Sequence, residues 1–117
     1  MQIPLEIDYG NIGPTPALTD AIRRHAAKLE RFHERVTGCR VSIETPHRHH
    51  HQGKPIKIHI RLTVPGSEIN VSHESGTAAH QDPQAAIRDA FDAARRQLED
   101  YARRQRGDVK RHSAPNP

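Results

Sequence analysis

The chain of 117 residues contains no tryptophan, one cysteine and few aromatic side chains of any kind. The lone Cys39 cannot form an internal disulfide, and no second thiol is present to complete a metal site built from cysteines. No apolar run approaches the roughly 20 residues that a membrane-spanning helix needs. The N-terminus also lacks the charged start and apolar stretch of a signal peptide. These absences predict a soluble cytoplasmic protein that is not embedded in a membrane.

Residues that commonly carry enzyme chemistry are present, but not in the contexts that this chemistry needs. The serines Ser67, Ser72 and Ser75 lack a nucleophile-elbow motif, and the glycines Gly66 and Gly76 belong to turns rather than to a phosphate-binding loop. Cys39 falls within an apolar alternation, where a thiol is typically inert. The sequence therefore predicts no enzyme, no cofactor and no small-molecule substrate.

Basic residues exceed acidic ones, with 18 Lys and Arg against 14 Asp and Glu and a formal net charge of +4. The length is most simply that of one domain with a core of moderate size. A basic excess favours an anionic partner, either a nucleic acid or an acidic membrane surface. The net charge alone does not distinguish between these two partners.

Hydrophobic periodicity predicts four strands and two helices. Apolar residues alternate over 3–9, 39–44 and 56–64, and a shorter strand includes Ile69 and Val71 beyond a Pro65-Gly66 hairpin turn. Helices with one apolar face begin at Thr15-Pro16 and Asp82-Pro83, where an N-cap residue precedes proline. We expect the first helix to end near Arg35, before Gly38, and the second to end at Arg106, before Gly107.

This β-α-β-β-β-α order predicts an α+β fold. Each strand and each helix has one apolar face, so a two-layer sandwich satisfies them all, with both helices on one face of a four-stranded sheet. The first β-α-β unit is expected to be a right-handed crossover and the later strands antiparallel hairpins. We expect a single domain over residues 1–107 and a disordered polar tail over 108–117.

Four cations recur along the first helix at spacings of four, three and four residues: Arg24, Lys28, Arg31 and Arg35. At about 100° per residue they share one helix face, and no acid lies within that stripe. The apolar face is predicted to comprise Leu18, Ile22, Leu29, Phe32 and Val36. An unneutralised stripe repels itself, and a polyanion would relieve that repulsion. The alternative interpretation is an ordinary solvated face.

The second helix carries more arginines but also more acids. Three acids stand four residues before an arginine, a spacing that favours ion pairing along a helix, namely Asp92–Arg96, Glu99–Arg103 and Asp100–Arg104. A self-paired solvated face is therefore the main alternative for this helix. The arginines least neutralised by this pattern are Arg88, Arg95 and Arg106, which makes them the better ligand candidates.

Four histidines crowd the connection between the second and third strands: His47, His49, His50 and His51. They are weak candidates for metal ligands, because metal sites normally need ligands held by ordered backbone and a Cys, Asp or Glu among them. Partly protonated histidines there could contact phosphate instead. Further candidate phosphate contacts are Arg48, Lys54, Lys57 and Arg61. The outer sheet face lacks the aromatics on which single-stranded RNA readers stack bases.

Three segments resemble, in order and spacing, a known family. They are Thr15-Pro16-Ala17-Leu18 with Lys28-Leu29-Glu30-Arg31-Phe32, then Leu62-Thr63-Val64-Pro65-Gly66 with Glu68, and finally Ala85-Ala86-Ile87 with Arg96-Gln97-Leu98 and Tyr101. Together these resemble the ribosome hibernation-promoting factor and ribosome-associated inhibitor family, also called sigma modulation proteins. The resemblance covers about residues 1–106. The histidine-rich hairpin is similar to that of a proteobacterial subgroup.

The resemblance implies a monomeric stress-response factor that binds the small ribosomal subunit and occludes tRNA and mRNA positions. By position, the basic helical surface that contacts ribosomal RNA in the family corresponds to Arg24, Lys28, Arg31, Arg88, Arg95 and Arg96. Arg35 extends the same stripe. The chain resembles a short form without the additional C-terminal domain that pairs two ribosomes. It departs from the family at Ala93, Glu99 and Asp100, where lysines are frequent. A histidine-rich metal-binding or sensing module and a generic double-stranded-RNA binder are the alternative functions.

Overall fold

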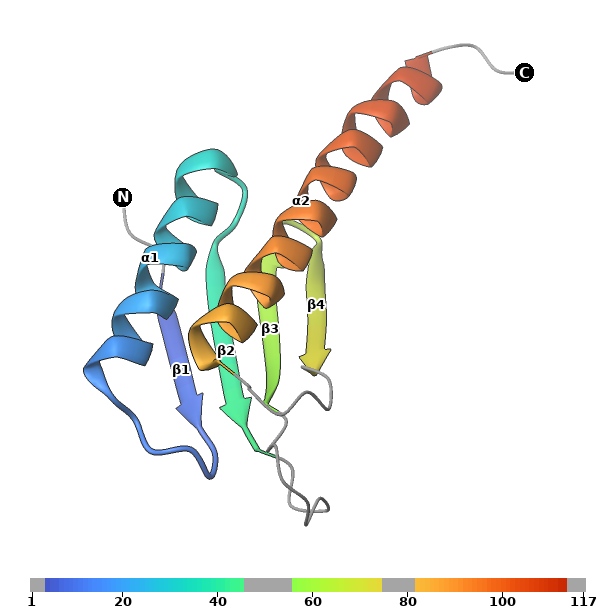
Figure 1. Cartoon of the computed structure of the whole chain (residues 1–117). Coiled ribbons are helices and arrows are strands. Elements are labelled where there is room, and N and C mark those ends of the chain that lie inside the picture. The colour runs from blue at the N-terminus through green and yellow to red at the C-terminus, as the bar shows by residue number, and fades with distance from the viewer. Residues whose placement is uncertain (1–3, 46–55, 75–81, 114–117) are drawn as a thin grey trace.

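The computed structural model describes residues 4–45, 56–74 and 82–113, with 107–113 described by their backbone alone. Figure 1 shows the element order, which confirms the predicted β-α-β-β-β-α arrangement. The elements are β1 (Leu5–Tyr9), α1 (Pro16–Phe32), β2 (Gly38–Glu44), β3 (Lys57–Val64), β4 (Ser67–Glu74) and α2 (Pro83–Ser113).

The four strands form one mixed sheet in the order β1-β2-β3-β4. Strand β1 runs parallel to β2, because α1 carries the chain back across the sheet between them. The other neighbours are antiparallel, as expected for hairpins, with Val41 opposite Ile60 and Ile60 opposite Val71. The β3–β4 turn is Pro65-Gly66, and Gly66 adopts a φ of +75°, the left-handed conformation that its turn position requires.

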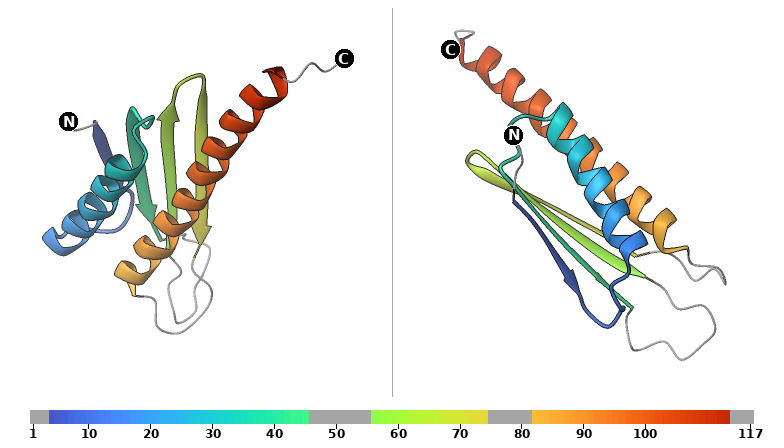
Figure 2. Two further views of the ribbon diagram at one scale, coloured as in Figure 1. Left: turned by 90° about the horizontal axis from the view of Figure 1, so that it is seen from above. Right: turned by 90° about the vertical axis from the view of Figure 1, so that its left-hand side faces the viewer.

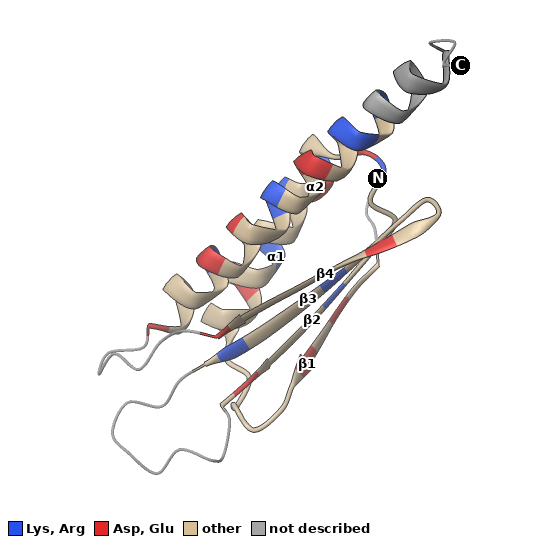
Figure 3. Cartoon of the chain, turned by 90° about the vertical axis from the view of Figure 1, so that its right-hand side faces the viewer, with Lys and Arg blue, Asp and Glu red and all other residues tan. Residues whose placement is uncertain are grey.

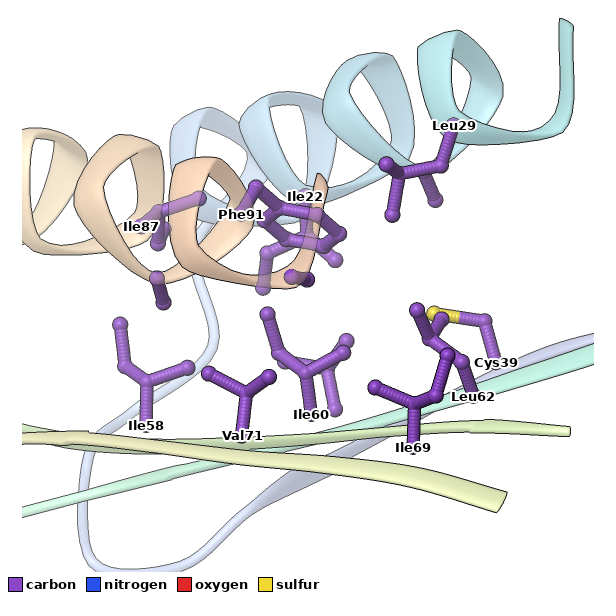
Figure 4. Packing of buried hydrophobic residues seen from close by; sticks show 14 of the residues in the cluster. Ile22, Leu29, Cys39, Ile58, Ile60, Leu62, Ile69, Val71, Ile87 and Phe91 are labelled. Atoms are coloured by element: carbon purple, nitrogen blue, oxygen red, sulfur yellow. The ribbon is translucent and has the colours of Figure 1, made fainter. Parts of the chain in front are cut away.

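Both helices cover the same face of the sheet, so the fold has two layers, as predicted (Figure 2). Figure 4 shows side chains of β3 and β4 pointing toward the helical side chains Ile22, Ile87 and Phe91. Every second residue of β3 from Ile58 to Val64 is buried there, and the residues between them face the other way. Tyr101 of α2 fixes that helix over the hairpin, since its hydroxyl donates to the Pro65 carbonyl oxygen at 3.1 Å.

Helix α1 begins as predicted but ends earlier. Thr15 is the N-cap, and its Oγ1 accepts from the Leu18 N–H at 3.2 Å. At the other end, His33 is the C-cap in an extended conformation, and its N–H donates to the Leu29 carbonyl oxygen at 2.8 Å. The predicted end at Arg35 was therefore wrong, because the helix ends at Phe32, three residues earlier. Arg35 lies in the turn that follows.

The shorter helix also changes the position of Phe32. This side chain was predicted to lie in the core, but it is 69% exposed. Val36 is buried instead, and it enters the core from the turn beyond α1 rather than from the helix itself. The apolar stripe of α1 consists of the buried residues Leu18, Ala21, Ile22, Ala26 and Leu29.

Helix α2 is longer than predicted, since it continues through Gly107 to Ser113. A single glycine inside a helix costs only about 1 kcal/mol relative to alanine, and no proline follows until Pro115. Residues 108–113, predicted to belong to a disordered tail, have a helical backbone, and 114–117 lie outside the described residues. A domain boundary at residue 107 stays a prediction. Strand β4 is likewise longer than expected, at eight residues.

Candidate nucleic-acid interface

A groove of about 610 Å³ lies between α1 and α2. The two helices run side by side over the sheet (Figures 1 and 2). Side chains from both helices line the groove: His25, Lys28, Leu29, Phe32 and His33 near α1, and Arg88, Phe91, Asp92, Arg95 and Glu99 on α2. The groove is therefore apolar in its depth and charged at its rim.

The imidazole of His25 stacks on the ring of Phe91 inside this groove, with centroids 5.4 Å apart and planes inclined by 15°. Burial lowers the pKa of His25, and the nearby cations Lys28, Arg24 and Arg88 lower it further, against an opposing contribution from Asp92. The ring is therefore neutral at neutral pH. The stacked rings of His25 and Phe91 therefore give the groove a flat, uncharged floor.

Three of the four predicted stripe residues lie on α1 as expected. Arg24, Lys28 and Arg31 are exposed, and none of them forms an ion pair with a residue that the structure describes. Lys28 is at the rim of the groove. Arg31 and Arg35 line a second, smaller hollow of about 280 Å³ between the end of α1 and α2. The row of cations thus continues beyond α1, because Arg35 lies in the turn that follows the helix.

The arginines of α2 are paired differently from the prediction. Arg95, expected to be poorly neutralised, bonds Glu99 at 3.1 Å, and Arg88 lies 3.5 Å from Asp89. The prediction that these two were the least neutralised was wrong. An acid on a helix can pair with the residue four positions before it as well as with the one four positions after it, and Glu99 pairs with the earlier Arg95. Arg88 pairs with Asp89, its neighbour in the sequence.

Of the three predicted ion pairs, the structure confirms one. Asp100 binds Arg104 at 3.0 Å and also Arg103 at 3.3 Å. Within residues 82–106, neither Asp92–Arg96 nor Glu99–Arg103 forms, and Arg96 is exposed without an ion pair to any described residue. Figure 3 shows how basic and acidic residues alternate along α2. Exposed pairs of this kind contribute about 0–1 kcal/mol, so a phosphate can replace the carboxylate as partner.

Two candidate phosphate contacts lie away from the groove. Lys57 and Arg61 alternate with the buried residues of β3 and so belong to the outer face of the sheet, where Arg61 lies 4.0 Å from Glu68. His59 stands between them and contacts the side chains of Ser72 and Asn70 at 3.1 and 3.2 Å. The structure therefore does not bring Lys57 and Arg61 together with the cations of the helices.

The histidine-rich connection falls outside the described residues, and with it His47, Arg48, His49, His50, His51 and Lys54. Within the described ranges, no group of three or more His, Cys, Asp or Glu side chains is placed to hold a metal ion. Cys39 is buried in the core, and this burial raises the pKa of its thiol to about 12. None of the helices in the described part is long and apolar enough to cross a membrane.

Sequence reasoning missed one feature of this interface, the exposed ring of Phe32. Phe32 lines both hollows. The signal was present in the sequence, since Phe32 is flanked by Arg31 and lies four residues after Lys28. The same position also fits the apolar stripe, so periodicity alone assigned it to the core.

Comparison with known proteins gives a match over most of the chain. The family model described as sigma 54 modulation protein / S30EA ribosomal protein matches residues 5–106. A ribosomal subunit interface protein from Coxiella burnetii superposes with a TM-score of 0.70 at 14% identity, covering 86% of this chain and 98% of that one. The N-terminal domain of Thermus thermophilus Protein Y gives 0.64 at 24% identity, covering 86% and 99%. Comparison with curated protein sequences gives no match.

Proposed function

The chain belongs to the sigma 54 modulation protein / S30EA ribosomal protein family, and from this membership we propose that it inhibits translation by occupying the small ribosomal subunit. Members of the family are ribosome-associated modulation factors and not enzymes. We further propose that ribosomal RNA is the direct partner, that the protein acts as a monomer in the cytoplasm, and that it occludes tRNA and mRNA positions.

The observation that carries the proposal is the row of cations without ion pairs beside the groove. Arg24, Lys28 and Arg31 form no ion pair with a described residue. Lys28 lines the groove, whose other rim carries Arg88 and Arg95, and Arg24 and Arg31 lie about one helical turn before and after it on α1. Phosphates are the ligands that such a surface neutralises best, and each contact releases condensed counterions from the nucleic acid. Arg96, also without an ion pair to a described residue, extends this surface on α2.

The way in which the fold holds these cations supports the proposal of occlusion. Both helices pack on a four-stranded sheet through a shared apolar core, so the charged face moves with the domain as one body (Figure 4). A rigid folded domain bound through rRNA phosphates excludes other macromolecules from the volume that it fills. We propose that this volume overlaps the positions of tRNA and mRNA on the small subunit.

Cosedimentation with purified small subunits across a salt series tests the proposal. Binding should weaken linearly on a double-logarithmic plot, with a slope of about −0.7 to −0.9 for each phosphate neutralised. The triple variant Arg24→Glu, Lys28→Glu, Arg31→Glu should abolish binding and keep its thermal stability, because these side chains are exposed. Absence of binding at low salt, or binding undiminished at high salt, would contradict the proposal.

A matched control reverses three cations on the opposite side of the molecule. Arg40→Glu, Lys57→Glu and Arg61→Glu change the net charge equally but alter the outer face of the sheet, which carries the candidate phosphate contacts Lys57 and Arg61. Binding should persist in this variant if the helical face is the binding site. Equal loss from both triple variants would contradict the assignment of binding to the helical face. Equal loss from changing His49, His50 and His51 to alanine would favour the histidine-rich metal-binding or sensing module instead.

A further inference from the structure

Phe32 is the one large hydrophobic side chain that the structure exposes among its described residues, at 69% of its surface. It is the last residue of α1 and lies between the two hollows, of about 610 and 280 Å³. The larger hollow falls within the range of about 300–1,000 Å³ that is typical of small-molecule sites. The Phe32 side chain is therefore exposed to solvent and adjoins both hollows.

The surroundings of this ring are basic. Five cations and three carboxylates line the two hollows together: Lys28, Arg31, Arg35, Arg88 and Arg95 against Glu34, Asp92 and Glu99. One of these acids, Glu99, is already engaged by Arg95. Lys28 and Arg31, one turn and one residue before Phe32, have no ion pair with a described residue. An aromatic face between such cations combines the two features of a single-stranded nucleic-acid site.

We propose that Phe32 is a stacking platform for one unpaired nucleobase of ribosomal RNA, an inference that rests on the proposed function. The base would lie against the exposed ring, and Lys28 and Arg31 would contact the phosphates on either side of that nucleotide. Stacking of this kind tolerates any base, because every base presents a π face. Phosphate contacts alone do not distinguish single-stranded from double-stranded RNA. Stacking on Phe32 adds affinity only where a base is unpaired and turned outward.

A protein partner fits this surface less well. Stable protein interfaces bury at least about 1,000 Å² and have an apolar centre. Phe32 has no second large exposed hydrophobic beside it in the described part of the chain, and charged side chains surround it. One ring in a cationic setting matches the size and the charge of a single nucleotide.

Two substitutions separate the π face from mere apolar volume. Phe32→Leu keeps an apolar side chain but removes the ring, and Phe32→Trp keeps a larger ring. We expect Phe32→Leu to weaken binding to purified small subunits about tenfold, as loss of one base–aromatic stack does, and Phe32→Trp to bind as the wild type. Both should keep the wild-type melting temperature, because the side chain is exposed. Equal binding by Phe32→Leu and the wild type would overturn the inference.

The absence of tryptophan from the chain makes Phe32→Trp a single fluorescent reporter. Its emission should be quenched on saturation with small subunits, and also with an oligoadenylate of about ten nucleotides, a length typical of single-stranded sites. Unchanged emission at saturation, or a blue shift without quenching as expected for a protein surface over the ring, would overturn the inference. The wild-type salt series decides the proposed function separately, since it does not depend on Phe32.

Discussion

His25 of α1 and Phe91 of α2 are joined by ring stacking, with centroids 5.4 Å apart, at the base of the groove between the helices. The contact places a titratable group between the two helices that carry the candidate rRNA contacts. Its pKa is lowered by burial first, and then by Lys28 and Arg24. The cations that are proposed to bind phosphate therefore also hold His25 neutral.

Binding should consequently be coupled to protonation of His25. Phosphates that neutralise Lys28 and Arg24 remove their repulsion, so binding raises the pKa of His25 and a proton is taken up. Affinity for small subunits should then increase as the pH falls from about 7.5 to about 5.5, across the usual range of histidine titration. The measurement is the dissociation constant at constant ionic strength for the wild type and His25→Gln. The other nine histidines are common to both proteins, so the difference between the two pH profiles isolates His25.

The same lowered pKa makes folding stability depend on pH. The unfolded chain takes up a proton at His25 near its ordinary pKa of about 6.5, but the folded protein takes it up only at lower pH. The stabilisation is thus complete above about pH 6.5 and is lost as the pH falls through that value toward the folded pKa. Urea unfolding should show a steeper loss of stability for the wild type than for His25→Gln over this interval. Parallel curves for the two proteins would contradict the lowered pKa.

Freeing Arg95 from its ion pair should strengthen RNA binding. Glu99→Gln removes the carboxylate that holds Arg95 at 3.1 Å and places less negative charge at the groove. We expect a severalfold gain in affinity for small subunits and a salt slope steeper by about 0.7–0.9, corresponding to one more phosphate contact. Glu74→Gln is the matched control, since it changes the net charge equally at an exposed position on β4. A similar gain in both variants would show a general charge effect and exclude a specific role for Arg95.

The sequence predicts most of this fold because its periodicities are regular. Strict alternation from Ile56 to Val64 sets the faces of β3, and proline after Thr15 and Asp82 marks the starts of both helices. Helix ends are less predictable, because the termination of α1 depends on the backbone of His33, which no residue preference dictates. That early end is what places Arg35 in a turn and leaves Phe32 exposed.

The candidate site is only partly predictable for a similar reason. The spacing of Arg24, Lys28 and Arg31 is enough to place them on one helix face. Ion pairing on α2 is different, because each acid there has basic residues within reach both before and after it. Which one it selects depends on side-chain conformations that spacing does not fix. The groove itself arises from how α1 and α2 lie beside each other, which neither helix encodes alone.

The left-handed backbone at Gly66 gives a test of the hairpin independent of RNA binding. Gly66→Ala should lower the free energy of unfolding by about 1–2 kcal/mol, because a Cβ is strained at a φ of +75°. Steric clash plays no part, since nothing lies within 4 Å of the added Cβ. Gly13→Ala is the matched control. Its Cβ also meets open space, but Gly13 has no positive φ, so alanine there should be neutral or stabilise by about 0.4–1 kcal/mol. Urea denaturation of both variants checks the difference, and equal stabilities would show that the turn tolerates an L side chain.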